Sequence, residues 1–84
     1  MINLNYDNRF DVLYIALGDD EYRKNSLADE EYNGLVVMRD EKTDNITGLI
    51  VFGFKDKYVK NKMPVFPQEV KINIEKDIVP FVTI

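Results

Sequence analysis

The chain has 84 residues, contains no cysteine and no histidine, and carries a formal net charge of −4 at pH 7. This length suits one small domain, residues 1–84, with apolar surface left over for an oligomer or a partner. The missing residue types exclude disulfides, thiolate and imidazole metal sites, and Ser-His or Cys-His nucleophiles. No apolar stretch reaches the roughly 18 residues of a membrane span, and the first residues do not resemble a secretory signal, so we expect a cytoplasmic protein without membrane contact.

Two strands are predicted near the N-terminus, over residues 2–6 and 11–17. In the first, apolar residues alternate with asparagine, which is typical of a strand with one face in water. The second, DVLYIAL, is apolar on both faces and is therefore expected to be a central strand that is covered on both sides. Asp7 and its neighbours favour a tight turn between the two strands, which then form a hairpin.

Residues 18–33 are polar and acidic, with no sustained period, and we interpret them as a long loop with at most one helical turn around residues 27–32. Two further strands are predicted over residues 34–39 and 46–54, joined by a connection of hairpin length. Gly48 and Gly53 in the second of these indicate a bulge or a close approach of another backbone.

A short helix is predicted over residues 55–61, because the residue before Pro64 must leave the helical region. Strict alternation of apolar and polar residues then predicts a fifth strand over residues 69–75. The tail, IVPFVTI, is apolar to its last residue and interrupted by proline, as in an edge strand or a docking segment. The predicted class is α+β: an antiparallel meander of four strands, a short helix, a fifth strand and an apolar tail.

The run YDNRFDVLYIAL resembles the opening signature of a family of small prokaryotic proteins catalogued as domain of unknown function 2283 (DUF2283). The matching residues are Tyr6, Asp7, Asp11, Leu13, Tyr14 and Ile15. GLVVMRDEKTDNITGLIVF is similar to the second half of that pattern, so the resemblance covers roughly residues 2–54. The family usually has a glutamate where this chain has Ile50, so no role of that carboxylate is carried over. Some members are encoded beside small ribonuclease-like toxins, and the resemblance therefore implies an antitoxin or immunity role.

The motif residues have a chemical interpretation and a structural one. Asp7 and Asp11 could form a carboxylate pair for acid–base chemistry. We favour the alternative, in which both accept hydrogen bonds from turn amides or pair with Arg9. Tyr6 and Tyr14 could stack on a nucleic-acid base, but their strands offer Asp and Asn rather than basic neighbours. We therefore expect both rings to pack in the domain with their hydroxyl groups at its rim, and we predict no catalytic residue.

Charged clusters are the other candidates. Acidic residues gather at 19–21, 29–31 and 40–44, and carboxylates suit Mg²⁺ or Ca²⁺, but no calcium-loop spacing is present, so we predict no metal site and no cofactor. Residues 55–84 hold six lysines against four acidic residues and are the only part with a positive balance. The basic patch consists of Lys55, Lys57, Lys60 and Lys62. We interpret it as the wet face of the helix, since the acidic chain argues against nucleic acid.

These observations favour a non-enzymatic protein-interaction domain, an antitoxin-like or regulatory partner. The alternatives are a divalent-cation binder or weak enzyme built on the acidic clusters, and nucleic-acid binding through the lysines. The apolar tail either folds back on its own sheet or adds a strand to the edge of another chain, and we expect a homodimer with the tail as contact. The candidate partner surface combines the lysine patch with Phe66, Ile72, Ile74 and Phe81.

Overall fold

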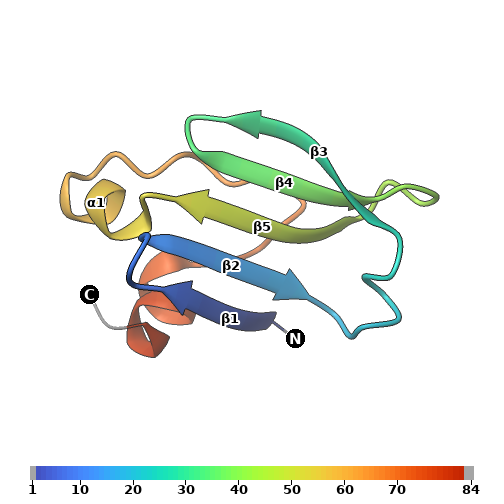
Figure 1. The fold of residues 1–84 in the computed structure, drawn as a ribbon, viewed down its shortest axis with the longest axis horizontal. Helices are drawn as coiled ribbons and strands as arrows, with labels where there is room; N and C mark the ends of the chain where they lie inside the picture. The colour runs from blue at the N-terminus through green and yellow to red at the C-terminus, as the bar shows by residue number, and fades with distance from the viewer. Residues whose placement is uncertain (1, 83–84) are drawn as a thin grey trace.

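A five-stranded antiparallel sheet dominates the computed structural model, which describes residues 2–82 (Figure 1). Its strands are β1 (Ile2–Asp7), β2 (Val12–Leu17), β3 (Ser26–Tyr32), β4 (Leu35–Asp40) and β5 (Ile46–Phe52). Helix α1 (Phe54–Val59) follows β5, and the described chain ends with a π-helical turn, η1 (Ile74–Ile78), and a 3₁₀ turn, η2 (Val79–Phe81). An antiparallel sheet with a few short helices agrees with the predicted class.

The order of the strands, β1-β2-β5-β4-β3, differs from the predicted meander. Strand β5 lies between β2 and β4, and residues 18–25 carry the chain from β2 to the far edge of the sheet. Five of the seven residues of β5 are buried, more than in any other strand. Such a strand is most stable at the centre, where neighbours on both sides shield it from water.

Strand β3 replaces most of the loop that we predicted for residues 18–33. Six of its seven side chains are exposed, so no hydrophobic alternation marks it, and it is held at the edge by its pairing with β4. The turn between the two strands consists of Asn33 and Gly34, which both have positive φ angles, 52° and 81°. Asn-Gly is the preferred pair for a two-residue hairpin turn. This pair is the feature of the sequence that indicates β3, and we did not use it in the prediction.

Gly48 occupies a close approach in β5, as predicted. A Cβ atom at this position would lie 2.9 Å from the carbonyl oxygen of Ile15 on β2, and the pairing with β4 shifts register beside it. Gly53 has a φ of 68° and turns the chain into α1. For this reason β5 ends before residue 53, and the helix predicted over residues 55–61 begins at Phe54 and ends at Val59.

Residues 60–82 fold back across one face of the sheet and pass behind it in Figure 1. The fifth strand predicted over residues 69–75 is wrong, because residues 69–73 pair with no strand and the chain then enters η1. The alternation still identifies the side chains that face inward, since Val70, Ile72 and Ile74 pack against the core. A segment lying across a sheet buries every second side chain, as a strand does, and the two patterns look alike in the sequence.

Two tyrosine hydroxyl groups form hydrogen bonds with the folded-back segment, residues 60–82. Tyr58 on α1 donates a hydrogen bond of 2.6 Å to the carboxylate of Glu75, and Tyr32 at the end of β3 donates to the carbonyl oxygen of Val65. Of the two predicted alternatives, the C-terminal segment therefore folds back on its own sheet. Among residues 2–82, no helix is long and apolar enough to cross a membrane.

The core lies between this segment and the sheet. On the sheet side it is formed by Leu13, Ile15, Val37 and Val51, which are at most 2% exposed. Phe54 from α1 and Ile78 from η1 are fully buried and complete the cluster from the opposite layer. The hydrophobic effect thus joins the sheet to the last third of the chain.

We expect Leu13→Ala to lower the free energy of unfolding by about 2–5 kcal/mol, because it removes buried methyl groups and leaves a cavity. This is a large part of the total of about 4–13 kcal/mol expected for a domain of this size. Urea unfolding followed by circular dichroism measures the change. Val59→Ala is the control, since Val59 is 68% exposed and its truncation should change little. Equal midpoints for Leu13→Ala and wild type would contradict the described core.

Candidate functional site

The carboxylate of Asp11 is the centre of the motif that runs from Tyr6 to Ile15. It accepts a hydrogen bond of 2.7 Å from the Tyr6 hydroxyl group. It also accepts the backbone amides of Lys55 and Asp56, at 2.7 and 3.1 Å. These amides belong to the first turn of α1, where the residue at the capping position, Gly53, has no side chain to offer. Asp11 therefore caps the helix from 44 residues away in the sequence.

Burial and hydrogen bonding set the protonation states of this pair. Burial opposes ionisation of Asp11, but the hydrogen bonds from Tyr6, Lys55 and Asp56 outweigh it and lower the pKa of the carboxyl group. Burial, reinforced by the Asp11 carboxylate, raises the pKa of Tyr6 to about 12. Asp11 remains ionised and Tyr6 protonated over the neutral range. The geometry supports a structural role rather than acid–base chemistry.

The remaining motif residues fall on three parts of the fold. Asp7 accepts the amides of Arg9 and Phe10 at 3.0 and 3.3 Å, in agreement with the turn-amide interpretation. Leu13 and Ile15 enter the core. Tyr14, which we expected to pack in the domain, points to the opposite face of the sheet and is 42% exposed, so that expectation is wrong for this ring. The motif thus builds the β1–β2 turn, the cap of α1 and part of the core.

The lysine patch is partly used within the fold. The ammonium group of Lys57 donates a hydrogen bond of 2.5 Å to the carbonyl oxygen of Phe52, and Lys60 pairs with Asp56 at 3.1 Å. Lys55 and Lys62 are exposed. Two of the four predicted positive charges therefore have partners on or beside the helix itself.

The apolar members of the predicted partner surface lie elsewhere. Phe66, Ile72 and Ile74 are partly buried and pack against the core of their own sheet. Phe81, in η2, is 73% exposed and lies near the β1 edge, where it lines a shallow pocket with Ile2 and Leu4. The structure does not bring these residues together with the lysines into one apolar surface.

The acidic clusters are arranged as turns and ion pairs. Asp19 accepts the amide of Tyr22 at 2.8 Å, and Asp40 accepts the amides of Lys42 and Thr43 at 2.7 and 3.0 Å, which lower the pKa of Asp40. Within residues 2–82, no group of three or more carboxylates is placed so that it could hold a metal ion. The cation hypothesis receives no support from this arrangement.

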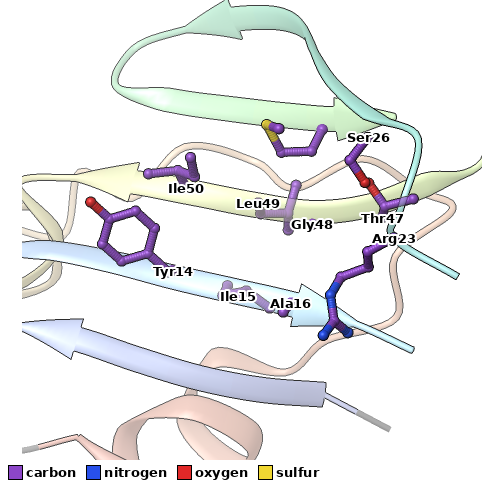
Figure 2. A pocket seen from close by; sticks show the side chains of 10 residues that line it. Tyr14, Ile15, Ala16, Arg23, Ser26, Thr47, Gly48, Leu49 and Ile50 are labelled. Atoms are coloured by element: carbon purple, nitrogen blue, oxygen red, sulfur yellow. The ribbon is translucent and has the colours of Figure 1, made fainter. Parts of the chain in front are cut away.

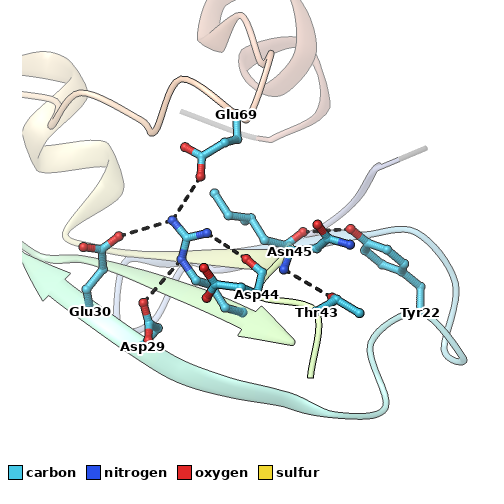
Figure 3. A network of polar contacts seen from close by, with 9 residues as sticks. Tyr22, Asp29, Glu30, Thr43, Asp44, Asn45 and Glu69 are labelled. Atoms are coloured by element: carbon cyan, nitrogen blue, oxygen red, sulfur yellow. Dashed lines mark hydrogen bonds and ion pairs between the residues drawn. The ribbon is translucent and has the colours of Figure 1, made fainter. Parts of the chain in front are cut away.

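Arg39 on β4 forms ion pairs with acidic residues of β3 and of the C-terminal segment (Figure 3). Its guanidinium group lies 3.3 Å from Asp29, 3.7 Å from Glu30 and 3.2 Å from Glu69. It also donates a hydrogen bond of 2.9 Å to the carbonyl oxygen of Asp44. One cation thus links the edge strand, the β4–β5 turn and the folded-back segment, and sequence reasoning did not identify it.

The other face of the sheet carries apolar side chains that the C-terminal segment does not cover, and Arg23 of the β2–β3 connection reaches one end of it. It faces the viewer in Figure 1, with the C-terminal segment behind the sheet. We call it the open face; on β2, β5 and β4 it consists of Val12, Tyr14, Ala16, Gly48, Ile50, Phe52, Val36 and Met38. Tyr14 and Phe52 are 42% and 46% exposed. The prediction that residues 11–17 are covered on both sides is therefore wrong for this face.

Small residues hollow out one end of the open face (Figure 2). Ala16 and Gly48 pair across β2 and β5 and line a cavity of about 230 Å³. The side chains of Tyr14 and Ile50 stand beside it. Arg23 lies at the far end, where its guanidinium group donates a hydrogen bond of 3.0 Å to the carbonyl oxygen of Leu17 and pairs with Asp20 at 2.8 Å. The hollow can take an apolar side chain.

No family model, no curated protein and no solved structure matches this chain. The resemblance to the DUF2283 family stays an expectation from the motif residues. Among the described residues, the open face is an apolar surface that spans three strands and is not covered by the C-terminal segment.

We expect Asp11→Asn to destabilise the domain by about 1 kcal/mol at pH 7, because it removes the charge that caps α1 while keeping a residue that tolerates the φ of 56°. The pKa of Asp11 is lowered in the fold, so its contribution is present above the unfolded value and is lost as pH falls through the folded value. The difference from wild type should begin to narrow below about pH 4 and should close only below the folded value. Urea unfolding between neutral and strongly acidic pH measures it.

Glu41→Gln is the matched control, because the side chain of this exposed residue makes no hydrogen bond or ion pair with any residue from 2 to 82. It should behave as wild type at every pH. An Asp11→Asn variant whose deficit persists unchanged into strong acid would contradict the charged cap.

Proposed function

We propose that this chain is a non-enzymatic protein-interaction domain whose binding surface is the open face of the sheet. The observation that supports it is the row of apolar and aromatic side chains across three neighbouring strands, in which Tyr14 and Phe52 are exposed and Ala16, Ile50, Val36 and Met38 are partly exposed. Contiguous apolar patches of this kind on small proteins mark surfaces that bind other proteins. Tyrosine, phenylalanine and methionine, all present here, are also the residue types enriched at such interfaces.

The border of the open face has the polar character of an interface rim. On β1 the outward positions are Asn3 and Asn5, both exposed, and Asp7, which is partly exposed. On β3 the outward position opposite Val36 is Glu31. An apolar centre with polar edges excludes water from the contact and leaves charge at its margin, where it sets orientation rather than affinity.

The identity of the partner is a separate matter. An antitoxin-like or regulatory role is what the resemblance to the DUF2283 family implies, and it belongs to the proposal on that ground alone. Nucleic-acid binding has weaker support, because Lys57 and Lys60 already have partners within the fold. The acidic turns likewise bind their own amides, which leaves a cation site without a specific observation in its favour.

The proposal predicts that partner capture depends on the open face. The double variant Tyr14→Glu/Phe52→Glu places two carboxylates at its centre, and burying them against a partner would be costly. Wild type and variant are immobilised and exposed both to the untagged chain and to a lysate of the source cells, followed by mass spectrometry. We expect proteins bound by wild type, this chain included, to be lost from the variant.

Val59→Glu/Val65→Glu is the matched control, since these valines are 68% and 80% exposed but lie outside the open face. It adds the same charge and should retain the bound proteins. Circular dichroism establishes that all three proteins are folded. An identical set of captured proteins for wild type and for Tyr14→Glu/Phe52→Glu would overturn the proposed function.

A further inference from the structure

We infer that the partner of the open face is a second copy of this chain, packed face to face across a two-fold axis to form a two-layer sandwich. This inference rests on the proposed function and names the occupant of that surface. It places the dimer contact on the side of the sheet opposite to the C-terminal segment, which already covers the core.

The open face is complementary to itself along the strands. Phe52 stands at one end of β5 and is 46% exposed, while Gly48 lies in the hollow at the other end, with Ile50 halfway between them. A two-fold axis that runs across the strands at Ile50 exchanges these ends. The ring of Phe52 from each copy then lies over the hollow of the other, and both hollows are filled by one symmetric contact.

The edges are compatible with the same axis, which places β1 of one copy opposite β1 of the other. Asn5 lies in the same row as Ile50, and its amide both donates and accepts hydrogen bonds, so the two copies of Asn5 can pair. Asn3 comes opposite Asp7 of the other copy, whose carboxylate can accept a hydrogen bond from the amide. The outward carboxylate of β3, Glu31, lies on an edge strand. Sheets packed face to face are rotated by about 30°, which separates such corners and leaves Glu31 in water.

The size of the face fits a modest homodimer. Five strands about 4.8 Å apart, each with about six residues at a rise of ~3.3 Å, give a face of roughly 24 by 20 Å. Two such faces in contact remove on the order of 1,000 Å² from water, which reaches the lower limit of specific interfaces. The two apolar faces of β2 and β5 would then both be buried, as their sequences predict.

The decisive residue for the test is Ile50, because the axis brings its two copies together. Ile50→Lys and Ile50→Glu each oppose like charges in a homodimer, and we expect each to dissociate about a hundredfold more readily than wild type. An equimolar mixture opposes lysine to glutamate and should recover the dimer as a one-to-one hybrid. Sedimentation velocity from low micromolar to several hundred micromolar protein measures all species.

Val59→Lys is the matched control, because it adds the same charge at an exposed valine outside the open face and should dimerise as wild type does. Ala16→Phe provides a second variant if charge at residue 50 prevents folding. It fills the hollow from within at a partly exposed strand position, and it should give a folded monomer.

The outcomes separate the inference from the proposed function. A monomeric wild type at every concentration overturns the dimer, as does dimerisation of the Ile50 variants and Ala16→Phe with unchanged affinity. If such a monomer still captures a different protein through Tyr14 and Phe52, the proposed function stands without the dimer. Loss of association in both single variants with recovery in their mixture supports the two-fold contact at Ile50.

Discussion

Two central strands that are apolar on both faces constrain the rest of the structure, and the segment that follows α1 covers one of these faces. Strands β2 and β5 send Leu13, Ile15 and Val51 to the covered side and Tyr14 and Phe52 to the other. The folded-back segment, fastened at its side by α1 and Arg39, seals the first side. The other side, the open face, is left uncovered by this segment, and it is the surface that makes the domain a candidate binding protein.

The position of that cover depends in turn on Asp11. Its carboxylate caps α1 and holds the hydroxyl group of Tyr6, while its carbonyl oxygen accepts the amides of Gly53 and Phe54. Because Asp11 in the β1–β2 connection accepts the first amides of α1, it fixes the position at which the helix begins. The first residue of the helix, Phe54, is buried in the core. From there Tyr58 reaches the C-terminal segment at Glu75. The motif around Asp11, whose carboxylates suggest acid–base chemistry in the sequence, thus connects the β1–β2 hairpin to the layer that covers the core.

The sequence was most informative where burial is regular. The two-sided strands, the helix and the core residues Leu13 and Val51 follow from apolar runs that only a central strand can satisfy. Strand β3 was missed because its stability comes from backbone pairing and from Arg39, neither of which leaves a hydrophobic period. The sheet order was missed because hairpin connections favour neighbours in sequence, whereas the burial of β5 decides the centre. The open face was concealed by the expectation that apolar strands are always covered.

Ile50 connects the sequence resemblance with the geometry. The family pattern has a glutamate at this position, and the structure places Ile50 in the middle of the open face, between Tyr14 on β2 and Val36 on β4. A carboxylate there would need water or a cationic partner, and a sheet carrying it could face solvent or a polar ligand. With isoleucine, the row across β2, β5 and β4 is apolar without interruption, and its burial against protein becomes favourable. The departure from the pattern therefore falls at the centre of the proposed contact.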